Sequence, residues 1–311
     1  MPDPIDIISP EGIATVLGSR KFAPVNYANR HRALGDHLGL DVSEIIDAIS
    51  HIPLCLHGEA HVATRKRIAK LIADSSDDAL AFIARDVPEM LRHLLSVGSH
   101  DVMAEFVNPC VNQLISTNIG IPLDLSHDTL VSRLFSQATG VSKRRRMNAE
   151  LADLRKLLSQ ELPSLTETEI GDRIALCILG TDALRGTLAG SLHAIFTGAE
   201  QSAEYPRTGV PYIDRQVLQS CPVDDVTYAP RSIVRARLDQ LESSKNTKDR
   251  NRFFGYGAHV CLGRKLALRL WEQVQESINA QPIAVSITDY KMRRDDVFCI
   301  PETFEIEIRN G

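Results

Sequence analysis

The chain has 311 residues, of which 43% are hydrophobic and 24% are charged, and its formal net charge is -5. This length and apolar content are sufficient for a large buried core, so we expect the chain to fold without a partner. The small acidic excess gives no general attraction to nucleic acid or to an anionic membrane, which argues against both as partners.

The lack of recognisable targeting signals and the pattern of cysteines indicate the cellular compartment. No run approaches the roughly 18 apolar residues that a membrane span requires, and the first residues, MPDPIDIISPEG, lack the basic and apolar regions of a signal peptide. We therefore expect a cytoplasmic protein whose six cysteines are thiols rather than disulfides. The cysteines share no CxxC spacing, which argues against a zinc cluster, and five of them should pack as small apolar residues.

Apolar residues recur at helical spacing along most of the chain. In order, the stretches are 10–17, 60–73, 78–96, 101–119, 128–160, 167–197, 210–220 and 262–279. Thr166 and Glu169 form a capping box, which marks the start of the longest helix. A polar loop is expected from Gln240 to Arg250, and strands only after Ala280. The pattern predicts a mainly α fold.

A glycine-rich segment, FGYGAHVCLG, runs from Phe254 to Gly263 just before the last helix. Its glycines allow the backbone to turn tightly or to approach a flat ligand closely. Cys261 would lie at the N-terminus of that helix, where the helix dipole and unpaired amide groups stabilise a thiolate. An anionic thiolate on haem iron pushes electron density toward bound oxygen, so this placement suits haem iron better than a redox thiol.

This segment resembles the haem-binding signature of the cytochrome P-450 family, Phe-Gly-x-Gly-x-His/Arg-x-Cys-x-Gly, at every fixed position. The resemblance extends over most of the chain from about residue 10 and implies a single, mainly α domain over 1–311. It also implies haem b as the cofactor and Cys261 as the ligand of its iron. Phe254, Gly255 and Gly263 would then contact the haem.

A pair of basic residues far upstream of this loop supports the same resemblance. His61 and Arg65 are one helical turn apart in EAHVATRKRIAKLI and so project from one face. In the family this helix supplies a basic pair to the haem propionates, and the resemblance carries that role to both residues and to His259. Taken alone, His61 would more often be a surface histidine than a ligand to a cofactor. His57 and His61, with Glu59, also have zinc-ligand spacing, but no third ligand is apparent.

The long helix departs from the family at Leu179-Gly180-Thr181-Asp182-Ala183, where the family usually has Ala-Gly-x-Asp/Glu-Thr over the distal face of the haem. The resemblance implies distal, catalytic positions for Gly180, Asp182 and Ala183, with Gly180 leaving room for a ligand. The family's threonine hydroxyl helps to deliver protons, and Ala183 has none. Thr181 points about 200° away from Ala183 and is a poor substitute.

Two further departures concern the ion pair and the sheet. The family's Glu-x-x-Arg pair is missing in the register that ends before Cys221-Pro222-Val223, where Arg215 and Leu218 stand. A second register, Glu204 to Arg207, would place Pro206 inside a helix. The family's N-terminal helix and first strands are absent, and 223–253 is too short for its usual strands. We interpret the chain as a compact variant with a reduced β-sheet portion.

The resemblance implies a haem-thiolate oxidoreductase, with monooxygenase-type oxidation of a small organic substrate in specialised metabolism. Basic residues at 65–70 and 264–269 could attract a ferredoxin or flavodoxin as electron donor. The missing threonine leaves open peroxide-driven oxidation, dehydration or isomerisation. A helper protein that stabilises a partner enzyme and a gas or redox sensor are the remaining alternatives. The run Lys143–Arg146 is either a solvated turn or an attractor of acidic substrates.

Overall fold

The computed structural model describes residues 4–124, 131–136, 139–198, 205–242, 244, 246–281, 283–293 and 297–310. They belong to two compact units. Unit 1 comprises Met1–Ala69, Leu130–Ala175 and Val210–Cys261, and unit 2 comprises Lys70–Thr129, Leu176–Gly209 and Leu262–Gly311. Helices predominate, which confirms the prediction of a mainly α fold. Within the described ranges, no helix is long and apolar enough to cross a membrane.

The helices of unit 1 were predicted only in part. Helix α1 (Pro10–Gly18) and the first part of α4 (Gly58–Asp74) agree with the apolar periodicity, and α7 (Val141–Glu161) covers the second half of the stretch at 128–160. Helices α2 (Tyr27–Leu38) and α3 (Ser43–Ser50) were not predicted. In α2 only His31 and Gly35 are buried, so an apolar stripe is lacking, and the ends are instead marked by the Asn26 cap and by Gly39 with φ +61°.

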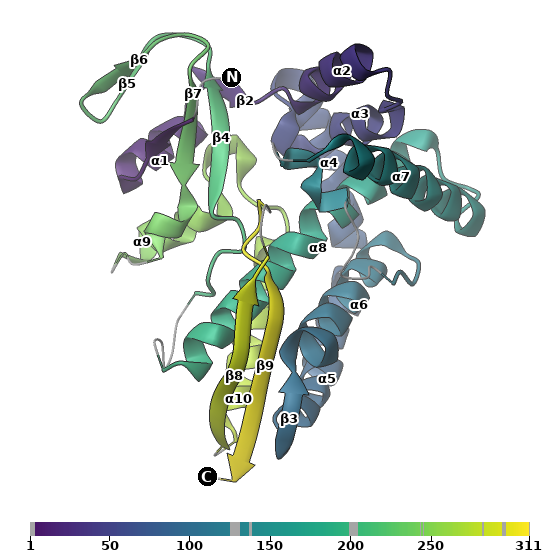
Figure 1. Ribbon diagram of the computed structural model, residues 1–311, viewed down its shortest axis with the longest axis vertical. Helices are drawn as coiled ribbons and strands as arrows, with labels where there is room; N and C mark the ends of the chain where they lie inside the picture. Colours follow the sequence, from purple (N-terminus) through teal and green to yellow (C-terminus); the bar gives the residue numbers. More distant parts are fainter. Residues whose placement is uncertain are drawn as a thin grey trace. The chain divides into compact units, whose positions relative to one another are not determined.

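Unit 1 also contains a mixed four-stranded sheet, which corrects two predictions. Its order is β1-β7-β4-β2, with β1 (Ile5–Ile7) parallel to β7 (Ile233–Arg237), and β4 (Tyr212–Val217) antiparallel to both β7 and β2 (Phe22–Pro24). The helix predicted at 210–220 is therefore a strand, and strands near the N-terminus and within 223–253 are present. A short hairpin of β5 (Cys221–Val223) and β6 (Val226–Tyr228) connects β4 to β7, as Figure 1 shows.

Helix α8 (Glu167–Phe196) begins where the capping box predicted. The Thr166 N–H donates to Glu169 Oε2 at 2.8 Å, and the Glu169 N–H donates to Thr166 Oγ1 at 3.3 Å. These reciprocal bonds satisfy two amide groups that have no partner inside the helix. The first turns of α8 belong to unit 1 and the remainder to unit 2.

Unit 2 packs helices against an antiparallel sheet. Helix α10 (Arg264–Asn279) lies on α5 (Ser76–Leu94), which also contacts α6 (Asn108–Ile119). Strands β8 (Ile283–Met292) and β9 (Pro301–Asn310) form the long hairpin seen in Figure 1, and β3 (Gly98–Asp101) extends it in the order β3-β9-β8. The strands predicted after Ala280 are confirmed. The core of this unit includes Trp271, Phe106, Phe304 and Leu114, each at most 1% exposed.

An extended segment that precedes β4 is fixed to α8 by hydrogen bonds. The Gly209 N–H donates to Thr187 Oγ1 at 3.1 Å, and the Arg207 N–H donates to Ser191 Oγ at 2.8 Å. Arg207 therefore lies outside any helix, while Glu204, its partner in the second Glu-x-x-Arg register, lies outside the described residues. Arg215 of the first register is on strand β4.

We expect Gly209→Ala to destabilise the protein by about 2 kcal/mol, since forced overpacking of a core costs about 1–3 kcal/mol. A Cβ at residue 209 would lie 2.2 Å from Ala183 O and 2.7 Å from Thr187 N, both backbone atoms that cannot move independently. Urea unfolding measures the change. Gly190→Ala is the control because its Cβ would meet only Arg207 Cβ at 3.5 Å. Equal stability of the two variants would contradict the packing of this segment on α8.

Candidate functional site

The predicted thiolate loop is closed by one short backbone bond. The Cys261 N–H donates to Phe254 O at 2.7 Å, and the rings of Phe253 and Phe254 stack with centroids 4.2 Å apart. Cys261 itself is exposed, whereas Cys110, Cys177 and Cys221 are buried. Helix α10 begins at Arg264, immediately after Gly263. The loop therefore holds the Cys261 backbone while leaving its side chain accessible.

Two glycines of the loop have backbone conformations that other residues rarely adopt. Gly255 has φ +87° and ψ 177°, and a Cβ there would lie 2.7 Å from His259 O. Gly257 has φ +63°, and a Cβ there would lie 3.1 Å from the Cα of Gly18 in α1. Gly255 and Gly257 are thus required by the loop itself, in addition to any role beside a flat ligand, whereas Gly263 has an ordinary negative φ.

Helix α4 brings its basic pair to the same loop. The ring centroids of His61 and His259 are 4.1 Å apart with an interplanar angle of 45°. Burial lowers the pKa of Arg65, and the nearby charge of Cys261 opposes that shift. The structure therefore places together four residues that the sequence assigned to one site: His61, Arg65, His259 and Cys261.

A fifth residue of this site, Arg215 on β4, was not predicted as a site residue. It is 2% exposed, its Nη1 donates to Asp214 O at 3.1 Å, and its Nη2 has no hydrogen-bond partner. Burial lowers the pKa of Arg215 to about 10. Burial lowers the pKa values of His61 and His259, and the nearby charge of Arg215 adds to both shifts. Only the strand assignment, which the sequence analysis missed, could have indicated it.

These basic groups fit an anion. Burial first, and then the charges of Arg215, His61 and Arg65, lower the pKa of His259 to about 3, so this ring is neutral near pH 7. His61 is 4% exposed, and its Nε2 has no hydrogen-bond partner. Buried donors without partners and unbalanced positive charge are unfavourable unless an acidic group binds them. The carboxylates of haem b meet this requirement, so the residues present fit the cofactor that the resemblance implies.

The zinc alternative finds no support. His57 and Glu59 are exposed whereas His61 is buried. Within the described ranges, no group of three His, Cys, Asp or Glu side chains has a geometry that could hold a metal ion. Single-thiolate ligation at Cys261 does not require such a group.

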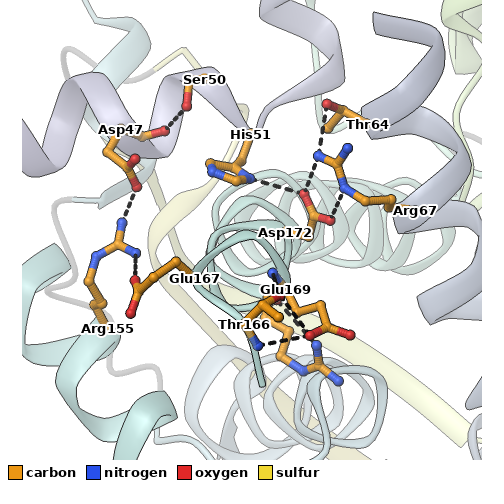
Figure 2. A network of polar contacts seen from close by, with 11 residues as sticks. Asp47, Ser50, His51, Thr64, Arg67, Arg155, Thr166, Glu167, Glu169 and Asp172 are labelled. Atoms are coloured by element: carbon orange, nitrogen blue, oxygen red, sulfur yellow. Dashed lines mark hydrogen bonds and ion pairs between the residues drawn. The ribbon is translucent and has the colours of Figure 1, made fainter. Parts of the chain in front are cut away.

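A buried polar network supports helix α4 two residues beyond Arg65 (Figure 2). Arg67 binds the Asp172 carboxylate of α8 through two hydrogen bonds, Nε to Oδ2 at 2.6 Å and Nη2 to Oδ1 at 3.0 Å. His51, at the end of α3, donates from Nδ1 to Asp172 Oδ1 at 3.0 Å. Gly171 leaves the space that the His51 ring fills, since a Cβ there would lie 2.5 Å from the ring. The network joins α3, α4 and the first turns of α8.

We expect Asp172→Asn to lower the free energy of unfolding by about 2 kcal/mol at pH 7, less than for a fully buried pair because Arg67 is partly exposed. Burial acts to raise the pKa of Asp172, but the hydrogen bonds from His51 and Arg67 outweigh it and the net pKa is lowered. The unfolded carboxyl therefore binds a proton first as the pH falls. The difference between variant and wild type should be full above the ordinary Asp pKa, should shrink as the pH falls below it, and should be lost only below the lowered native pKa. Urea unfolding between pH 7 and pH 3 measures this, and a difference that does not depend on pH would contradict it.

The residues that the sequence assigned to the distal side lie in unit 2. Asp182 is 1% exposed and accepts from Arg185 Nη1 at 3.3 Å, and Arg185 Nη2 donates to Asn112 at 3.0 Å. A Cβ at Gly180 would lie 2.6 Å from Ile115 Cδ1, so the space beside this glycine is used by a side chain of α6. Asp182 is therefore a buried carboxylate that pairs with Arg185 within unit 2.

Between Leu176 and Ala189, one face of α8 is only half-buried while the other residues are buried. The half-buried residues recur at helical spacing: Leu176, Leu179, Gly180, Ala183, Leu184 and Thr187. Ala183 lies on this face, whereas Thr181 is 5% exposed and its hydroxyl has no hydrogen-bond partner. Apart from Thr187, the face is thus apolar, and it lacks a hydroxyl at residue 183.

No protein-family model and no curated protein sequence matches this chain. Solved structures do match it. A thermophilic cytochrome P-450 from Sulfolobus tokodaii matches with TM-score 0.72 and 18% identity, over 100% of this chain and 96% of that chain. The tirandamycin C-bound monooxygenase TamI matches with TM-score 0.74 and 16% identity, over 98% and 89%. A cytochrome P-450 in complex with an acyl carrier protein that carries hexadec-9Z-enoic acid matches with TM-score 0.74 and 16% identity, over 98% and 91%. With this coverage of both chains, the chain has the cytochrome P-450 fold.

Proposed function

We propose that this chain is a haem-thiolate oxidoreductase that oxidises a small organic substrate. Cys261 would ligate the haem iron, and the loop that contains Phe254, Gly255 and Gly263 would hold the haem. His61, Arg65 and His259 bind the propionates, together with Arg215. When bound, haem supplies the oxidising chemistry, while the protein residues hold the cofactor and present the substrate.

The observation that carries this proposal is the combination of an accessible cysteine with buried, unbalanced basic groups beside it. Burial lowers the pKa of Arg65, and the charge of Cys261 acts in the opposite direction. His61 and Arg215 each have a buried nitrogen without a hydrogen-bond partner. A flat cofactor with two carboxylates and a metal for the sulfur satisfies all of these groups at once. The fold supports the proposal, since the similar structures include a cytochrome P-450 monooxygenase and another in complex with an acyl carrier protein.

Monooxygenase-type oxidation is the first choice, with Gly180, Asp182 and Ala183 on the distal side and a ferredoxin or flavodoxin as electron donor. A specific observation favours peroxide-driven oxidation as the second candidate. Ala183 supplies no hydroxyl, and the Asp182 carboxylate is engaged by Arg185. Neither residue is then well placed to move a proton, a step that oxidation by peroxide requires less.

A turnover experiment separates the two candidates. The haem-loaded protein is incubated with a panel of small apolar and amphipathic substrates, once with a ferredoxin and its reductase and once with hydrogen peroxide, and products are identified by mass spectrometry. Oxygenated product with the reductase supports a monooxygenase, and product only with peroxide supports the second candidate. Cys261→Ala is the control and should form product with neither. Ala183→Thr should increase the reductase-driven rate.

A further inference from the structure

The basic run Lys143–Arg146 lies in the first turns of α7 and contains one buried arginine. Lys143, Arg145 and Arg146 are exposed, as expected of a solvated helix face, but Arg144 is only 4% exposed. The run is therefore not a turn between helices. Its buried member requires a separate explanation, because an arginine is rarely buried without a partner of opposite charge.

The protein neighbour that Arg144 binds is neutral. Arg144 Nη1 donates to His31 Nδ1 at 2.8 Å, and His31 Nε2 lies 2.8 Å from Leu134 O. Because a carbonyl oxygen only accepts, Nε2 carries the proton of His31 and Nδ1 is the acceptor. Burial first, then the charges of Arg144 and Arg30, lower the pKa of His31 to about 4 despite the bond to Leu134. His31 orients the guanidinium but does not balance its charge.

No acidic side chain balances Arg144 in the part of the chain that the structure describes. Its Nε has no hydrogen-bond partner, and burial together with the charge of Arg30 lowers its pKa. The end of α7 beside it is also positive, because the N-cap is Gly140 and forms no side-chain cap on this 21-residue helix. A buried cation without an anion is unfavourable by several kcal/mol. These features together indicate an anion that none of the described residues provides.

Buried apolar residues lie along the elements that position Arg144 and His31: Met147 is one turn further along α7, and Leu134 provides the carbonyl that binds His31. Leu134, Phe135 and Met147 are at most 8% exposed, and the rings of Tyr27 and Phe135 meet edge to face with centroids 5.4 Å apart. Small inorganic anions gain nothing from such neighbours, whereas a carboxylate attached to a hydrocarbon body gains from both its charge and its apolar surface.

We propose that Arg144 binds the carboxylate of an amphiphilic substrate, with Arg30 as a second positive charge and His31 as the residue that orients the guanidinium. The designation as substrate rests on the proposed oxidoreductase function, whereas carboxylate binding at Arg144 does not. The chemistry is that of an aliphatic carboxylic acid of medium length.

Calorimetric titration of the haem-loaded protein with decanoate and with decanol tests this site. Decanoate should bind wild type at least tenfold more tightly than decanol, and Arg144→Met should weaken decanoate binding at least tenfold. Arg145→Met, an exposed neighbour on the same helix, is the matched control and should bind as wild type does. Arg144→Met should also unfold at no lower temperature than wild type without ligand, because it removes an unbalanced buried charge.

Two outcomes would overturn the proposal: equal binding of decanoate and decanol by wild type, or unchanged decanoate binding by Arg144→Met. The test is independent of the haem assignment. Cys261→Ala should keep decanoate binding, so a failure of the haem proposal would be seen in the absorbance spectrum and a failure of this one in the titration.

Discussion

Gly255→Ala should abolish the haem-thiolate site, with at least a hundredfold loss of haem affinity. Residue 255 combines φ +87° with ψ 177°, a region that is almost exclusive to glycine, and its new Cβ would lie 2.7 Å from His259 O. Backbone strain of this kind costs about 1–3 kcal/mol, and the contact with His259 O adds to it. The loop must then open, which breaks the bond between Cys261 N and Phe254 O.

Titration of the purified protein with haemin, followed by absorbance, measures the affinity. Ala258→Ser is the matched control, since residue 258 is exposed in the same loop and should leave haem binding unchanged. If Gly255→Ala bound haem as wild type does, the loop conformation described above could not be the one that holds the cofactor.

Arg215→Met should weaken haem binding about a hundredfold, because loss of one member of a buried, hydrogen-bonded charge pair costs 2–5 kcal/mol or more. In the haem-free protein the same change should cause little or no loss of stability. The guanidinium there has one nitrogen without a partner, and its charge lowers the pKa of both site histidines. Loss of affinity without loss of stability is the signature of a ligand-binding arginine as opposed to a structural one.

The exposed Arg20 offers a control of the same chemistry, and Arg20→Met should change neither quantity. Haemin titration and urea unfolding of both variants give the comparison. A large loss of stability in haem-free Arg215→Met, with haem affinity unchanged, would assign Arg215 to the core of the sheet and remove it from the site.

The sequence predicted the elements that depend on local patterns and missed those that depend on pairing between residues distant in the sequence. Helices α5 and α10 have strong apolar periodicity, and α8 has a capping box, so local patterns identified all three. The four-stranded sheet was missed because β1 and β2 have only three residues each, and their partners β7 and β4 are distant in the sequence, as in the pairs of Ile5 with Val234 and Phe22 with Val217. Pairing at such distance leaves no periodic signal within a short strand.

The candidate site divides in the same way. The thiolate loop is contiguous, so its glycines and Cys261 could be identified from the family's signature, and the resemblance also indicated His259, together with His61 and Arg65 on one face of a helix. Arg215 reaches the site from a strand, and only its position in the folded sheet indicates a role. Arg144 shows the opposite case, since its neighbours in the sequence suggested a solvated run and only its burial sets it apart.

Ligation of haem iron by Cys261 is tested most directly by the carbon monoxide difference spectrum of the dithionite-reduced protein. The protein is expressed with a haem precursor, and Cys261→Ala is prepared in parallel. Wild type should show a strongly red-shifted Soret band, which is typical of thiolate ligation, and Cys261→Ala should lack this band. Absence of haem from wild type, or an unshifted band that is identical in both proteins, would contradict ligation by Cys261 and would favour a protein that keeps this fold to stabilise a partner enzyme.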